Sequence, residues 1–135
     1  MSDTLRKIDV HVHSQCYPDI SLPRPDGSNF ASPEQVLSMY DSWGIEYGVL
    51  QPAFSNECCY AAFTNEEACM VSRKYPKRFF WFCDLSPRMG ENGPATDFDA
   101  IVNHYKSIGA KGVGELCYNL PFDDPLSEKL LAACA

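Results

Sequence analysis

The strongest constraint on the fold is the order of the hydrophobic patterns, because strand-like and helix-like segments alternate along all 135 residues. The strand-like runs are short and apolar or alternating, whereas the segments between them place apolar residues at helical spacing. Strands are expected at 7–13, 46–54, 78–85 and 110–117, and helices at 32–44, 64–76, 96–109 and 123–135. Such alternation favours a parallel sheet with right-handed crossovers. The chain is therefore predicted to be an α/β protein of about four βα units.

Capping residues place the starts of three of these helices. Ser32 with Gln35, and Thr64 with Glu67, have the spacing of a capping box, in which each side chain bonds the other residue's backbone amide. Asp124 stands before a proline, as an N-cap residue often does. We therefore expect helices to begin directly after Ser32, Thr64 and Asp124.

The first strand carries polar side chains in the pattern Asp9, His11, His13. Residues two apart in a strand project to the same face, so all three side chains are expected to lie together. Imidazole nitrogens are common ligands of divalent metals, and the carboxyl ends of strands are where barrel active sites assemble. The alternative is a pair of partly exposed strand histidines with no ligand.

With these residues in place, the sequence resembles the amidohydrolase superfamily. The stretch "DVHVH" is similar to the HxH pair on the family's first strand, "YPKRFFWFCDLSP" to its third strand, and "GAKGVGELCYNLPFDDPLSEKLLAACA" to the fourth strand and following helix of the amidohydrolase-related branch. That branch includes decarboxylases of the aminocarboxymuconate-semialdehyde type. The resemblance implies that residues 1–135 form the N-terminal half of a TIM-type (β/α)8 barrel, truncated after the fourth strand and its helix.

The resemblance also implies a metal site. His11 and His13 would bind a divalent metal, zinc being expected first and manganese or iron remaining open, and Glu115 would be a direct or bridging ligand and a catalytic group. Asp9 would not bind the metal itself but would contact one of the histidine ligands and fix its orientation. The family's further histidines and its catalytic aspartate come from later strands. For Glu115 the alternative is an ordinary surface or salt-bridged acid.

Three functions follow from this interpretation. The first is a metal-dependent hydrolase that acts on a small carboxylate, lactone or amide through a metal-activated water, with this chain alone expected to be inactive. The second is a metal-dependent decarboxylase of the same family. The third is a non-catalytic half-barrel that closes by forming a homodimer or by pairing with another chain. Seven scattered cysteines make a small metal or redox protein the weakest alternative, because no CxxC pair occurs.

Charge and hydropathy exclude some partners. The net charge is −7 and no basic stripe is present, which argues against a nucleic-acid partner. The longest apolar run, 79–83, is too short to span a membrane, and no export signal is visible. A cytoplasmic protein is therefore expected. Its cysteines, Cys58 and Cys59 included, are expected to be reduced and mostly buried.

Other polar residues have two interpretations each. Asp84 is interpreted as a turn-forming acid rather than a pocket-lining group, and His104 as a histidine on the flank of a helix. The loop 14–31 is expected to overhang the mouth of the barrel, where Tyr17 and Arg24 could contact substrate.

Overall fold

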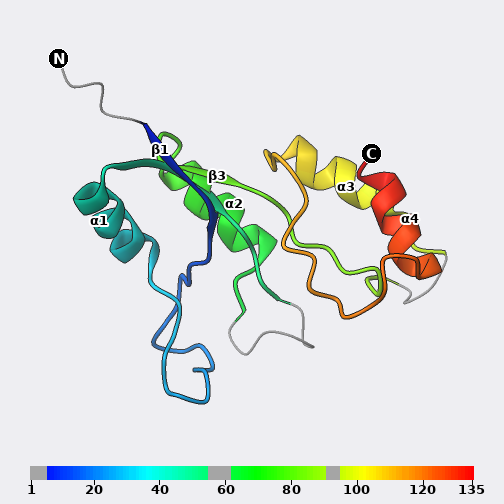
Figure 1. Ribbon diagram of the computed structural model, residues 1–135, viewed down its shortest axis with the longest axis horizontal. Helices are drawn as coiled ribbons and strands as arrows, with labels where there is room; N and C mark the ends of the chain where they lie inside the picture. Colours follow the sequence, from blue (N-terminus) through cyan, green and yellow to red (C-terminus); the bar gives the residue numbers. More distant parts are fainter. Residues whose placement is uncertain (1–5, 55–61, 91–94) are drawn as a thin grey trace.

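The computed structural model describes residues 6–54, 62–90 and 95–135, and its sheet has three parallel strands in the order β1-β2-β3 (Figure 1). The strands are β1 (Lys7–Val12), β2 (Ile45–Leu50) and β3 (Phe79–Trp81). The helices are α1 (Pro33–Trp43), α2 (Asn65–Lys74), α3 (Phe98–Ser107) and α4 (Pro125–Ala133). The predicted α/β class with parallel strands is confirmed.

The helix starts lie where the capping residues predicted them. Ser32 and Gln35 form a complete capping box at α1, and Thr64 and Glu67 form another at α2. The side chain of Asp124 accepts a hydrogen bond from the backbone amide of Leu126 at the start of α4. These caps satisfy amides that the first helical turn leaves unpaired, which is why the local sequence marks these boundaries well.

The predicted fourth strand at 110–117 is wrong as a regular strand, although the segment lies where it was expected. It forms a single parallel bridge, between Cys83 and Val113. Backbone hydrogen bonds of 2.9 Å run from Lys111 N to Trp81 O, from Cys83 N to Gly112 O and from Gly114 N to Cys83 O. Three glycines at 109, 112 and 114 weaken the strand because they offer no side chains to pack.

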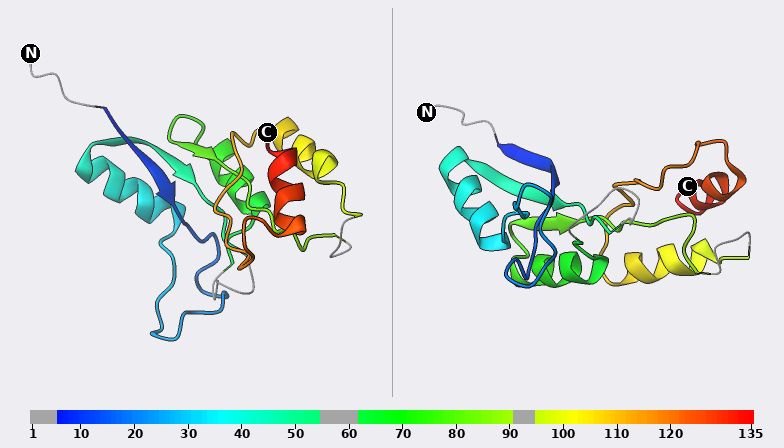
Figure 2. Two further views of the ribbon diagram at one scale, coloured as in Figure 1. Left: turned by 45° about the vertical axis from the view of Figure 1, so that its right-hand side comes forward. Right: turned by 90° about the horizontal axis from the view of Figure 1, so that it is seen from below.

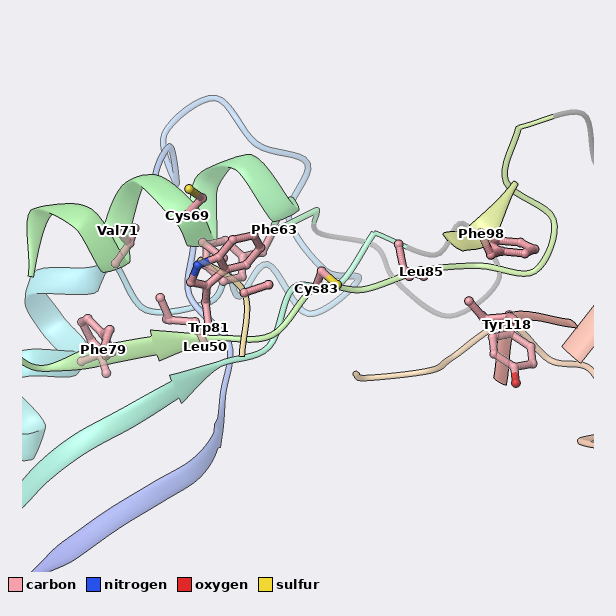
Figure 3. Packing of buried hydrophobic residues seen from close by; sticks show 14 of the residues in the cluster. Leu50, Phe63, Cys69, Val71, Phe79, Trp81, Cys83, Leu85, Phe98 and Tyr118 are labelled. Atoms are coloured by element: carbon pink, nitrogen blue, oxygen red, sulfur yellow. The ribbon is translucent and has the colours of Figure 1, made fainter. Parts of the chain in front are cut away.

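The two faces of the sheet differ in how they are covered. The register pairs Asp9 with Gly48 and Gly48 with Phe79, so these residues share one face, and α1 and α2 pack on that face. Trp81, Phe79 and Leu50 are buried there beneath α2 (Figure 3). Figure 2 shows α2 and α3 along the same side of the sheet.

The other face of the sheet is apolar and open. Ile8 pairs with Tyr47 and Val49 with Phe80, and the Tyr47 and Phe80 rings stack with centroids 5.2 Å apart. Ile8 is 57% exposed and Phe80 is 39% exposed. In a closed barrel such a face points inward, whereas here no described residue covers it fully.

Among the described residues, no helix is long and apolar enough to cross a membrane.

Candidate metal centre

A bulge near the end of β1 separates Asp9 from the histidines. Asp9 pairs with Gly48 and Val12 with Leu50, so three steps along β1 match two along β2. The Asp9 carboxylate consequently faces α1, where it accepts hydrogen bonds from the Tyr40 hydroxyl at 2.8 Å and from the His11 backbone amide at 3.0 Å. The expectation that Asp9 shares a face with the histidines is therefore wrong. It holds the backbone at the bulge, and its contact with His11 is to the amide, not the ring.

Beyond the bulge, His11 and His13 meet Glu115, and we call these three residues the His–His–Glu cluster. The two Nε2 atoms lie 3.1 Å apart, and each is 3.3 Å from Oε2 of Glu115. Glu115 comes from the segment beside β3, so the cluster joins the two ends of the described sheet region. The three predicted ligand residues are thus brought together at the carboxyl ends of the strands. The alternative of a salt-bridged acid at Glu115 agrees with the same contacts, because each histidine lies within ion-pair distance of its carboxylate.

His13 is held in one orientation by its neighbours. Its Nδ1 lies 2.8 Å from the backbone carbonyl oxygen of Gln51, at the end of β2. A carbonyl only accepts hydrogen bonds, so Nδ1 carries a proton and Nε2 is the nitrogen that faces the cluster. Phe30 packs against the ring with centroids 5.0 Å apart. This arrangement, with one nitrogen bonded to protein and the other free to bind, is typical of metal-ligating histidines.

The spacing of the cluster fits a divalent cation. Ligands at roughly 2.0–2.1 Å from a tetrahedral ion are separated by about 3.3 Å, and the observed separations are 3.1 to 3.3 Å. Two imidazole lone pairs at this distance also repel each other unless a proton or a cation lies between them. Two nitrogens and a carboxylate oxygen suit zinc, manganese or iron. The donors present therefore fit a divalent metal, without selecting zinc.

Asp84 is a buried group whose carboxylate is influenced by the charge of Glu115, and the interpretation of it as a simple turn residue is wrong. It follows β3 and is only 4% exposed. Its carboxylate accepts a hydrogen bond from Phe54 N at 3.3 Å, and Asn65 binds its backbone amide at 2.8 Å and its carbonyl at 2.9 Å. Burial raises the pKa of Asp84 to about 6, with a further contribution from the charge of Glu115. Nothing in the local sequence indicates this environment, because Asn65 lies on another element.

The loop between β1 and α1 is tied together at its two ends, and its Arg24 packs on Phe30 (Figure 1 shows the loop). The Ser14 hydroxyl and the Gln15 amide both donate to the Ala31 carbonyl, at 2.9 and 3.1 Å. The Arg24 guanidinium lies over Phe30, 4.2 Å from the ring centroid, and Phe30 in turn contacts His13.

Other predicted residues lie away from the cluster. Tyr17 is exposed and lines a groove with Met70 and Tyr75, on α2 and its C-terminal cap, so the structure does not place it with the cluster. His104 is an exposed residue of α3, as its interpretation as a helix-flank histidine requires. Cys58 and Cys59 lie outside the described residues. The described cysteines are thiols rather than disulfides.

Comparison with known proteins shows where this fold occurs. No protein-family model and no curated protein matches the sequence. Solved structures do match, among them a probable 2-pyrone-4,6-dicarboxylic acid hydrolase from Acinetobacter baumannii with citric acid bound, at 21% identity and a TM-score of 0.64, covering 96% of this chain and 46% of that one. A 5-carboxyvanillate decarboxylase from Sphingomonas paucimobilis matches at 19% identity and a TM-score of 0.64, covering 97% and 49%.

A second 5-carboxyvanillate decarboxylase, from Novosphingobium aromaticivorans with bound manganese, matches at 13% identity and a TM-score of 0.61, covering 98% and 48%. The chain thus spans slightly less than half the length of these three proteins. At these identities the likeness is one of fold. The matches also include a protein named as an amidohydrolase II and a TIM-barrel protein from Bordetella bronchiseptica, and the chain has the fold of about half of such a barrel.

Proposed function

We propose that this chain carries the first part of a metal-dependent hydrolase site, in which His11, His13 and Glu115 hold a divalent cation. The observation that supports this most is the triangle of donor atoms 3.1 to 3.3 Å apart at the carboxyl ends of the strands. A cation held there would polarise a carbonyl group and lower the pKa of a water molecule. The protein residues supply the orientation: Gln51 fixes His13, and Asp9 with Tyr40 fixes the backbone of His11.

The substrate we propose is a small molecule that carries a carboxylate, such as a lactone or amide with an acidic substituent. Arg24 supports this choice, because its guanidinium lies over Phe30, which packs against His13. Guanidinium groups bind carboxylates through paired, charge-assisted hydrogen bonds. Decarboxylation of a similar acid is the alternative chemistry. Assays for carbon dioxide release and for ester or amide cleavage, run on the same acids, distinguish the two reactions.

A half-barrel that self-associates is the second candidate, and the open face of the sheet favours it. Ile8 is 57% exposed, Val10 is 70% exposed and Phe80 is 39% exposed. Burying this apolar surface against a second copy would stabilise both chains. Sedimentation velocity tests the idea: a dimer that dissociates on Val10→Lys substitution supports it, and a chain that stays monomeric and cooperatively folded at high concentration argues against it.

Metal content tests the first proposal directly. The chain is purified without added chelator, exposed to manganese or zinc, desalted and analysed by mass spectrometry of its metals. We expect close to one ion per chain in the wild type and in His104→Ala, which removes an exposed histidine of α3 that is not part of the cluster. His11→Ala with His13→Ala should lose the ion. Equal metal content in all three proteins would overturn the proposal.

A further inference from the structure

Gln51 hydrogen-bonds to β1 at Val10 and Val12, on both sides of His11. Its side chain also lies beside Gly114, the residue before Glu115. Gln51 follows β2 directly and is only 6% exposed. Its backbone amide donates to the Val12 carbonyl at 2.9 Å, and its backbone carbonyl accepts from His13 Nδ1 at 2.8 Å. The main chain of Gln51 is therefore already part of the framework that positions the His–His–Glu cluster.

The side-chain amide of Gln51 has a defined orientation. Its Nε2 donates to the backbone carbonyl of Val10, at 3.3 Å. A carbonyl can only accept, so the amide nitrogen has to face Val10 and the amide oxygen has to face the other way. That direction leads toward Gly114, because a Cβ added to Gly114 would lie 3.4 Å from Oε1 of Gln51. Gly114 immediately precedes Glu115 in the chain.

The amide oxygen that faces this segment has no partner among the described residues. Oε1 of Gln51 is buried, and no described residue donates a hydrogen bond to it. A buried carbonyl oxygen without a donor loses its hydration and gains nothing in return, so it lowers stability. An unpaired buried polar atom in a native protein calls for a reason, and coordination of an ion is one such reason. Gln51 is tied to the cluster through the hydrogen bond between its backbone carbonyl and His13, and its side chain lies beside the residue before Glu115, so a cation at the cluster is the candidate partner for this oxygen.

We propose that Oε1 of Gln51 is a further oxygen donor to the cation held by the His–His–Glu cluster. This inference rests on the proposed metal site. An amide oxygen is a hard donor of the kind that manganese, magnesium and calcium accept readily, whereas thiolate and imidazole suit zinc better. The donors from the described residues would then be two nitrogens and two oxygens. Gln51 therefore shifts the preference of the site from zinc toward manganese.

Substitution of Gln51 by Met and by Glu tests the inference on the 135-residue chain. Calorimetric titration with manganese and with zinc gives the affinities, and denaturant unfolding in the presence of a chelator gives the metal-free stability. Gln51→Met keeps the size of the side chain and removes the oxygen. We expect it to lower manganese affinity at least tenfold and zinc affinity less. Gln51→Glu, which keeps an oxygen donor, should bind manganese at least as tightly as the wild type.

The control is Gln35→Met, which breaks the capping box of α1 and leaves the site residues in place. We expect it to lower stability and to leave both affinities unchanged. A wild type that binds neither ion would overturn the proposed function together with this inference. A wild type that binds manganese, with Gln51→Met binding it equally well, would overturn the inference alone. So would parallel losses of manganese and zinc affinity, because they would mean that Gln51 acts only through the framework.

Discussion

Asp84 should make the stability of the metal-free chain fall as the pH rises from 4 to 7. Burial, with the charge of Glu115 adding to it, raises the pKa of this carboxyl from its ordinary 3.8 to about 6. The folded chain therefore holds this proton more tightly than the unfolded chain does. The resulting stability is fully present below pH 3.8 and is lost as the pH rises through about 6. At about 1.4 kcal/mol per pKa unit, the upper bound of the loss is about 3 kcal/mol.

Urea unfolding between pH 4 and pH 8, in the presence of a chelator, measures this effect. Asp84→Asn removes the titrating proton and keeps the hydrogen-bond acceptor, so the difference in unfolding free energy between mutant and wild type should grow in favour of the mutant as the pH rises. Glu115→Gln is the matched variant: it removes only the added charge, so it should flatten the wild-type profile in part. A constant difference between Asp84→Asn and wild type across this range would refute the reasoning.

Three further outcomes are expected. Gly48→Ala should destabilise the chain by about 1–3 kcal/mol or more in urea unfolding, because the new Cβ would lie 2.5 Å from the Tyr40 hydroxyl oxygen; a neutral result would mean that α1 is not packed on β2 as described. Asn65→Ala should lower the free energy of unfolding by about 2–5 kcal/mol, because it leaves the buried backbone amide and carbonyl of Asp84 unpaired. Unchanged stability of this variant would contradict those two contacts. Cys16 should react slowly with iodoacetamide at pH 8, because burial raises the pKa of its thiol to about 11. Mass spectrometry locates the label, and rapid labelling of Cys16 would argue against this environment.

The parts of the fold that the sequence predicts well are local. Ser32 and Thr64 mark helix starts because a cap involves residues within one turn, and the structure contains both capping boxes. His11 and His13 could be paired because residues two apart in a strand project to the same face. Glu115 is added to them through the resemblance to the amidohydrolase superfamily, and the order of the elements alone does not select it.

The features that the sequence does not predict depend on contacts between distant segments. The bulge at β1 turns Asp9 toward Tyr40, and strict alternation of side chains cannot anticipate one extra residue. The burial of Asp84 depends on Asn65, which the sequence marks only as the first residue of a helix. The orientation of Gln51 likewise follows from a carbonyl on β1. In each case the residue type is compatible with several roles, and a contact with a distant segment decides which role it has.

The central claim is that His11, His13 and Glu115 bind one divalent cation, and anomalous diffraction from crystals grown with manganese tests it most directly. The account predicts a single strong anomalous peak at roughly 2.0–2.3 Å from Nε2 of both histidines and from a carboxylate oxygen of Glu115. An anomalous map with no peak at this position, from crystals that contain saturating manganese, would contradict the claim.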